Sequence, residues 1–188
     1  MSKEIGLFKN GCWIETYTGQ FVNPLKLQPD DIDIKDIANA LSLMCRFNGH
    51  CSKFYSVAEH SIRVSGILKG IDNQLTGLLH DATEAYMADI ARPVKWALPQ
   101  VREIEGIISR AITEKFDLKG DWRSVKNADN ILLATEARDL MFTQGKEWYL
   151  PVKPLEYRIE PMESWNAESN FLRIFEMLES DKNKVKVL

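Results

Sequence analysis

Apolar residues recur at intervals of three and four along most of the chain, a spacing that predicts a series of amphipathic helices. The first expected helix runs from an N-cap at Asp33 to about Cys45, where a turn over residues 46–50 ends it. Further helices are expected from Ser56 to about residue 70, around His80, and over residues 99–116, 124–142 and 164–179. The helix around His80 follows the preceding one at once, so we expect the two to be antiparallel neighbours.

The N-terminal part follows a different pattern. The β-prone runs 13–17 and 21–22 flank Thr18-Gly19-Gln20, a turn in which the glycine permits a positive φ. We therefore expect a small β-hairpin within residues 11–24. The predicted fold class is mainly α: a single-domain helical bundle with a small N-terminal β-hairpin. Its expected parts are an extension at 1–30, the bundle at 31–180 and a frayed tail at 181–188.

Composition narrows the class of protein. A chain of 188 residues with 45% hydrophobic and 27% charged residues can bury the core of one globular domain. The formal net charge of −3 provides no basic surface for duplex nucleic acid. No run approaches the roughly 20 apolar residues that span a bilayer, so no membrane partner is expected. Three cysteines and no apolar leader argue against a disulfide framework and predict a cytoplasmic protein.

One histidine falls where an apolar residue would be expected. Ser56 and Glu59 have the spacing of a capping box, which sets the start of a helix. On that helix His60 lies within the apolar stripe. A polar ring that faces the core needs partners, so His60 is either a satisfied structural histidine or a metal ligand.

A second polar group closes the apolar run that follows. On a helix, His80 and Asp81 can address one point, with Glu84 one turn further on, while Leu75, Leu78, Leu79 and Ala82 are buried. Imidazole with carboxylate suits Zn, Mn, Fe or Co. A capping aspartate beside a hydrogen-bonded core histidine is the plainer interpretation. Asp129, however, lies on or beside the apolar side of the 124–142 helix, and one shared metal explains these buried polar groups more economically.

Two further clusters carry candidate chemistry. Asp89, Arg92 and Lys95 occupy a connecting loop around Pro93, which suits a rim that faces an anion. Cys45, His50 and Cys51 could suggest a second zinc site. That cluster offers only three ligands at unusual spacing, so we prefer a turn-stabilising or phosphate-facing role for His50.

These residues together resemble a known family. His60, then His80-Asp81, then Asp129 match the H…HD…D signature of the HD-domain metal-dependent phosphohydrolases. The strings CRFNGHCSKFYSVAEHS (45–61), LLHDATEAYMADIARPVK (78–95) and VKNADNILLATEARDLM (125–141) look like the branch that includes bacterial 5′-deoxynucleotidases and phage-type nucleotide hydrolases. The resemblance covers residues 30–142. Asn39 departs from it where many relatives have histidine, but it lies outside the ligand set.

The resemblance implies roles for particular residues. His60, His80, Asp81 and Asp129 would bind one divalent transition metal, which could be Co, Mn, Fe, Zn or Ni. Glu84 would orient the attacking water or handle its proton, with Asp81 also at the catalytic centre. Arg46 would grip phosphate, Phe47 would lie near sugar or base, Asp89 would contact the sugar 3′-hydroxyl, and Lys95 is a further phosphate candidate. Arg46 and Lys95 as surface cations, Phe47 as core and Glu84 as a surface acid are the plainer interpretations.

The expected function is phosphate release from deoxynucleoside 5′-monophosphates. One alternative is a triphosphohydrolase that converts a dNTP to nucleoside and tripolyphosphate. Cleavage of a cyclic phosphodiester is a third possibility, although no second paired His-Asp set is present for the extra metal. The non-enzymatic alternative is an HD domain that only senses a nucleotide. The hairpin and the aromatic last helix would allow a homo-oligomer.

Overall fold

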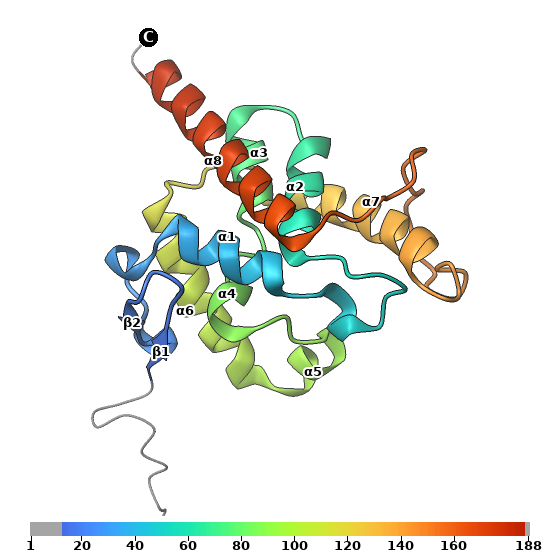
Figure 1. Ribbon diagram of the computed structural model, residues 1–188, viewed down its shortest axis with the longest axis horizontal. Helices are drawn as coiled ribbons and strands as arrows, with labels where there is room; N and C mark the ends of the chain where they lie inside the picture. Colours follow the sequence, from blue (N-terminus) through green and yellow to red (C-terminus); the bar gives the residue numbers. More distant parts are fainter. Residues whose placement is uncertain (1–12, 187–188) are drawn as a thin grey trace, which may run out of the picture.

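The computed structural model describes residues 13–186, with side chains to Val185. It is mainly helical, as predicted, and Figure 1 shows the long C-terminal helix α8 (Ser164–Lys186) lying across the bundle. α8 packs against α1 (Ile34–Leu43), α2 (Val57–Ile67) and α3 (Ile71–Leu78). The remaining helices are α4 (Glu84–Met87), α5 (Arg92–Ala97), α6 (Pro99–Lys115) and α7 (Trp122–Leu140), with short 3-10 turns η1 (Pro24–Lys26), η2 (Pro29–Asp31) and η3 (Arg46–Gly49).

The predicted hairpin is confirmed. β1 (Ile14–Glu15) pairs antiparallel with β2 (Phe21–Val22), and Gly19 adopts φ 82° in the turn. Residues 11 and 12 of the predicted segment lie outside the described residues. The amide and hydroxyl of Thr18 donate to the carboxylate of Asp36 on α1, at 2.7 and 3.0 Å. These bonds fasten the hairpin to the bundle.

The helix starts at Asp33 and Ser56 are also confirmed. Asp33 accepts a hydrogen bond from the Lys35 amide, and Ser56 accepts one from the Glu59 amide. The capping box is only half formed, however. The buried Glu59 carboxylate instead binds Arg63 and accepts from the Met162 amide, because its side chain turns toward the segment before α8.

The expected helix around His80 is wrong in detail. α3 ends at Leu78, and His80 and Asp81 lie in a turn before α4, whose first residue is Glu84. α2 and α3 do pack against each other, and Gly77 lies at this contact. A Cβ there would overlap Leu68 Cδ1 and lie 3.5 Å from Ser65 Cα. The helix expected from Ser56 to about residue 70 ends at Ile67, and Ile71 starts α3 after Gly70, which adopts φ 85°.

Two later boundaries also differ from the prediction. Arg92 begins α5 although a proline follows it, since Pro93 occupies the first turn where its missing N–H costs nothing. The expected frayed tail is helical as far as Lys186. The Lys182 ammonium is buried and donates to the carbonyl oxygens of Phe116 and Asp117, which anchors this end of α8.

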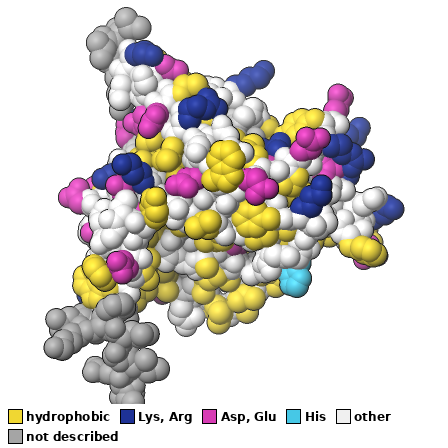
Figure 2. All heavy atoms as spheres, viewed as in Figure 1, with side chains coloured by type: hydrophobic (Ala, Val, Ile, Leu, Met, Phe, Trp, Pro, Cys, Tyr) yellow, Lys and Arg dark blue, Asp and Glu magenta, His cyan; other side chains and the backbone are white. Residues whose placement is uncertain are grey.

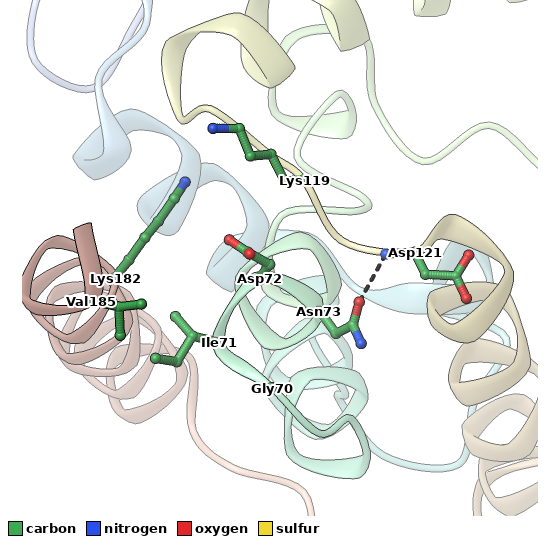
Figure 3. A pocket seen from close by; sticks show the side chains of 8 residues that line it. All are labelled: Gly70, Ile71, Asp72, Asn73, Lys119, Asp121, Lys182 and Val185. Atoms are coloured by element: carbon green, nitrogen blue, oxygen red, sulfur yellow. Dashed lines mark hydrogen bonds between the residues drawn. The ribbon is translucent and has the colours of Figure 1, made fainter. Parts of the chain in front are cut away.

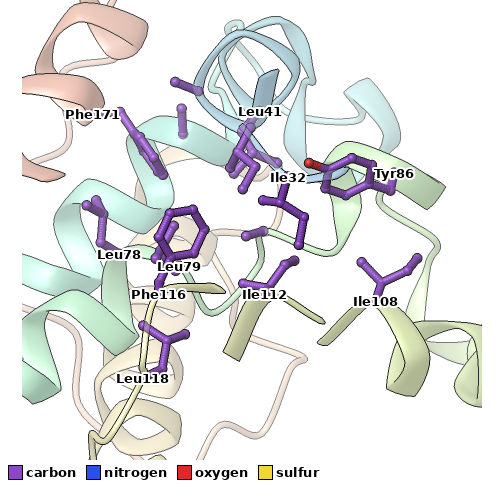
Figure 4. Packing of buried hydrophobic residues seen from close by; sticks show 14 of the residues in the cluster. Ile32, Leu41, Leu78, Leu79, Tyr86, Ile108, Ile112, Phe116, Leu118 and Phe171 are labelled. Atoms are coloured by element: carbon purple, nitrogen blue, oxygen red, sulfur yellow. The ribbon is translucent and has the colours of Figure 1, made fainter. Parts of the chain in front are cut away.

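Two apolar clusters hold the fold together. The larger one joins α1, α3, α6 and α8, with Leu41, Leu78, Ile108 and Phe171 fully buried (Figure 4). The smaller one packs α7 against α2 through side chains such as Val64 and Leu132. α2 contributes to both clusters, so a polar side chain at its centre is removed from bulk water on every side.

Acidic and basic side chains are interspersed on the face shown in Figure 2, which carries no basic stripe. Among the described residues, no helix combines the length and apolar character needed to cross a membrane.

Candidate metal centre

Three side chains predicted as ligands come together in the structure. His60 lies in α2 and is fully buried, His80 lies in the turn after α3, and Asp129 lies on α7. Each offers one ligand atom, and these atoms all lie within 4.8 Å of one another. The group could hold a metal ion. Its ligands come from two helices and a turn, rather than from the three helices expected.

The side chains of His80, Asp81 and Asp129 all approach the Nε2 atom of His60. His60 Nε2 is 3.3 Å from His80 Nε2 and 3.4 Å from Asp129 Oδ1. Asp81 Oδ2 lies 3.5 Å from His60 Nε2 and 3.3 Å from His80 Nε2. Asp81 is therefore adjacent to the group, although it is not a member of the mutually close set of three.

The other nitrogen of each ring shows which atom faces the centre. His80 Nδ1 is 2.8 Å from the Gly77 carbonyl oxygen, which can only accept, so this nitrogen carries the proton. His60 Nδ1 is 2.6 Å from Glu136 Oε1, and the pKa of that carboxyl is lowered even though burial opposes this. Both rings thus donate from Nδ1 and direct Nε2 at each other and at two carboxylates. A divalent cation fits this set of acceptors, and the carboxylate and carbonyl partners match those of known metal-binding histidines.

The electrostatics of the group favour a positive charge at the centre. Burial and Arg46 lower the pKa of His60, but the Glu136 and Asp129 carboxylates outweigh them and raise it to about 9. Burial lowers the pKa of His80. The pKa of Asp129 is held far below its usual range by His60, His80 and Lys126, against the effect of burial. The surrounding carboxylates therefore stabilise one positive charge at the point where the two Nε2 atoms face each other.

Arg46 connects this group to the surface. Its guanidinium reaches Glu136 Oε2 at 3.2 Å and Asp81 Oδ2 at 3.5 Å. Burial opposes its charge, yet these carboxylates raise the pKa of Arg46 above its ordinary value. The predicted turn is present as η3, which starts at Arg46, and Phe47 and Asn48 adopt left-handed backbone angles within it. Such angles cost about 1 kcal/mol or more in non-glycine residues, so the surrounding structure must hold this loop in place.

A cavity of about 770 Å³ opens beside the group. It is lined by eight of the ten predicted site residues: Arg46, Phe47, His50, Asp81, Glu84, Asp89, Lys95 and Asp129. His60 and His80 are the other two and belong to the candidate ligand group with Asp129. The volume is within the range of small-molecule sites. Residues far apart in the chain thus share one pocket beside the candidate metal centre.

Glu84 is a buried acid in that pocket. It is 6% exposed, and its Oε2 has no hydrogen-bond partner among the described residues. Burial, Asp81 and Asp89 raise the pKa of Glu84 to about 9, with Arg46 and Lys95 acting in the opposite direction. Ala88, at φ 69° and ψ 162°, reverses the chain after α4 and brings Asp89 to the same pocket.

Two of the lining cations already have partners. Lys95 Nζ is 2.8 Å from Glu105 Oε1 on α6, and Lys126 Nζ is 2.6 Å from Asp129 Oδ2. His50 lines the cavity but is exposed. Cys45 and Cys51 place their sulfur atoms 3.5 Å apart. Among the described residues, His60, His80 and Asp129 form the only cluster of three or more potential metal ligands, so a second zinc site gains no support.

Three residues at this site were not predicted from the sequence. Glu136 orients His60, Lys126 pairs with Asp129, and Trp148 lines the cavity. A signal for Glu136 was available, since it follows Asp129 by seven residues and therefore lies on the same face of α7. Trp148 is in a loop, where periodicity carries no information.

Fold and site together define a class: a mainly helical domain with a partly buried two-histidine, one-aspartate group that could hold a metal beside an open pocket. The chain belongs to the family of the Escherichia coli "Uncharacterized protein YfdR", with which it is 44% identical over 137 residues, 72% of this chain and 76% of YfdR. It is also 32% identical over 143 residues to the Rhodobacter capsulatus "Uncharacterized protein RCAP_rcc00048", 69% of this chain and 73% of that protein. No protein-family model matches the chain.

Proposed function

We propose that the protein is a metal-dependent phosphohydrolase of the HD type that releases phosphate from deoxynucleoside 5′-monophosphates. The observation that carries the proposal is the convergence of two Nε2 atoms and the Asp81 and Asp129 carboxylates at one wall of a cavity that also contains Arg46 and Glu84. The resemblance of His60, His80-Asp81 and Asp129 to the H…HD…D signature of the HD-domain phosphohydrolases supports the same assignment.

In this proposal His60, His80, Asp81 and Asp129 hold one divalent metal of the series Co, Mn, Fe, Zn and Ni. Such an ion lowers the pKa of water and offsets charge on a transferred phosphoryl group. Glu136 and the Gly77 carbonyl keep the two imidazoles oriented with Nε2 inward. Arg46 supplies planar N–H donors for phosphate oxygens, and its bonds to Asp81 and Glu136 fix the guanidinium before substrate arrives.

Glu84 handles the proton in the proposed reaction. Its buried carboxyl borders the same cavity as Asp81, and its Oε2 accepts no hydrogen bond from any described residue. Burial and the neighbouring carboxylates raise the pKa of Glu84, so the carboxyl holds a proton at neutral pH and can donate it to the leaving oxygen as a general acid. Asp89 provides an acceptor for a sugar hydroxyl at the next position along the wall.

The charge balance of the cavity favours a monophosphate over a triphosphate. Four basic side chains line it, Arg46, Arg92, Lys95 and Lys126, against four acidic ones, Asp81, Glu84, Asp89 and Asp129. Lys95 and Lys126 are already paired with carboxylates. A tripolyphosphate chain would require a larger excess of unpaired cations along its length.

The test is a product analysis. Purified protein is stripped with chelator, reloaded separately with Mn²⁺, Co²⁺, Ni²⁺, Fe²⁺ and Zn²⁺, and incubated with dNMPs, NMPs and dNTPs. Phosphorus NMR should show inorganic phosphate from dNMPs. Tripolyphosphate from dNTPs would instead support the triphosphohydrolase alternative. Tight nucleotide binding with no turnover under any metal would support a sensor and contradict the proposal.

A further inference from the structure

The cavity has an aromatic end that the proposed phosphate chemistry does not use. Phe47 and Trp148 both line it, and their rings meet edge to face with centroids 5.9 Å apart. The Arg46 guanidinium lies 5.2 Å from the Phe47 ring centroid. Arg46 in turn contacts Asp81, so the aromatic pair is joined to the candidate metal centre through one side chain. The cavity thus combines a site for an anion with flat apolar surfaces.

The loop that carries Trp148 is folded against α7 by a specific contact. Gly145 adopts φ 70°, and a Cβ at this position would lie 2.8 Å from Ala137 Cβ. A main-chain hydrogen bond of 2.9 Å from the Ser52 amide to the Leu140 carbonyl ties the end of α7 to the segment after η3. The two loops that bear Phe47 and Trp148 are therefore held together by backbone contacts.

Each of the two loops contains an aromatic residue with a left-handed backbone. Phe47 has φ 56°, and Tyr149, directly after Trp148, has φ 47°. Left-handed angles in residues with large side chains persist where the surrounding structure imposes them, and they cluster at ligand-binding segments. Here both strained residues belong to loops that form one wall of the same cavity. Trp148 is half-buried, and among the described residues its ring packs against one other aromatic ring, that of Phe47.

A second large cavity lacks the aromatic lining of the cavity beside His60. It has a volume of about 630 Å³ and lies between the starts of α3 and α7 and the end of α8 (Figure 3). Its lining includes Asp72, Lys119 and Lys182 but no aromatic ring, and Lys182 already donates to two carbonyl oxygens. This cavity therefore does not pair an aromatic wall with a candidate metal group, whereas the cavity beside His60 does.

We propose that Trp148 is a specificity-determining residue that stacks on the planar nucleobase of the substrate, with Phe47 supporting the indole ring from its edge. This inference rests on the proposed phosphohydrolase function and deepens it, because a stacking residue selects nucleotides over phosphate esters that lack a nucleobase. Stacking on an aromatic side chain accepts any base, so Trp148 selects for the presence of a base rather than for its identity.

The first experiment compares two substrates that differ only in the base. Trp148→Ala, in metal-loaded full-length protein, should lower kcat/KM for dAMP by about tenfold to hundredfold, the loss typical of removing one base–aromatic stack. Its kcat/KM for 2-deoxyribose 5-phosphate should stay within about twofold to threefold of wild type. Phe142→Ala is the matched control, since Phe142 is an aromatic residue of the same loop but is fully exposed. Equal losses on both substrates, or equal effects of both variants, would overturn the inference.

The second experiment does not depend on turnover. Addition of 2′-deoxyadenosine or dAMP to chelator-treated protein should quench tryptophan fluorescence, and Trp148→Phe should remove most of that quenching while Trp165→Phe, which replaces an exposed residue of α8, should not. If wild type hydrolyses no phosphate ester but shows Trp148-dependent quenching, the proposed function fails and base binding stands. If it hydrolyses dAMP without Trp148-dependent quenching, the function stands and the role of Trp148 is rejected.

Discussion

Glu136 Oε1 lies 2.6 Å from Nδ1 of His60, and both side chains are completely buried. The second oxygen of the same carboxylate lies 3.2 Å from Arg46. One buried acid therefore orients a candidate metal ligand and the arginine that faces the cavity. Removing its charge would disturb both groups at once.

Glu136→Gln should weaken divalent-metal binding by about 10- to 100-fold, the usual effect of losing a carboxylate that supports a metal-binding histidine. The amide keeps the shape but loses the charge that favours Nδ1–H on His60. Metal affinity can be measured by competition with a coloured chelator. Glu176→Gln on the exposed side of α8 is the control and should bind like wild type. Unchanged affinity in Glu136→Gln would rule out the positioning role.

Asp81→Ala tests whether Asp81 is a ligand, because it is close to both Nε2 atoms but outside the mutually close set of three. We expect loss of bound metal after dialysis, together with loss of hydrolysis. Thermal unfolding offers a second measurement, since metal at 100 times its Kd should stabilise wild type by about 2.7 kcal/mol. That stabilisation should be largely absent in Asp81→Ala. A variant that retains stoichiometric metal would place Asp81 outside the coordination shell.

Glu84→Gln should separate catalysis from metal binding. The side chain is buried and keeps its size, so the folded structure and the metal content should be preserved. The turnover number should fall by about 10²- to 10⁴-fold, the contribution typical of one acid–base group. Metal content by atomic absorption and kcat with dNMPs provide the two measurements. A kcat close to wild type would remove Glu84 from the proposed mechanism.

Asp139 provides a prediction about pH and stability that is independent of the metal group. Its carboxylate is 4% exposed, accepts from the Ile159 amide and pairs with Arg138 and Arg158. Burial raises its pKa, but these bonds prevail and lower the pKa of Asp139 from 3.8 to about 2. Because the folded-state pKa is the lower one, the contribution to stability is present above pH 4 and is lost as pH falls toward 2.

Asp139→Asn should therefore reduce the free energy of unfolding by about 1–2 kcal/mol at pH 7, after allowance for the exposed Arg158 partner. The difference from wild type should shrink between pH 4 and pH 2. Urea titrations at pH 7, 4, 3 and 2.5 measure it. A difference that is constant over this range would mean that the ionised carboxylate is not what stabilises the segment.

The ends of the helices show which features the local sequence pattern can predict and which it cannot. Asp33 and Ser56 cap helices as predicted, because a side-chain oxygen and the amides it accepts from are neighbours in the chain. Glu59 did not complete its box, because Met162, more than a hundred residues away in sequence, competes for its carboxylate. His80 and Asp81 were expected on a helix, yet α3 ends at Leu78, before it reaches them. Periodicity does not report such a break.

The amino-acid sequence alone indicated a mainly helical fold and placed His60 in an apolar stripe, and the family resemblance grouped His60, His80, Asp81 and Asp129. The structure brings three of these four together, with Asp81 beside them. Hydrophobic spacing and capping chemistry act over a few residues and can be read locally. The three-dimensional packing was needed to show that Glu136 contacts His60, that Lys95 pairs with Glu105, and that Trp148 shares a cavity with Phe47. The partners in these contacts lie ten or more residues apart and meet only when helices and loops pack. The pair of Lys126 and Asp129 differs, because the two residues are three positions apart on one helix and their spacing is a local pattern.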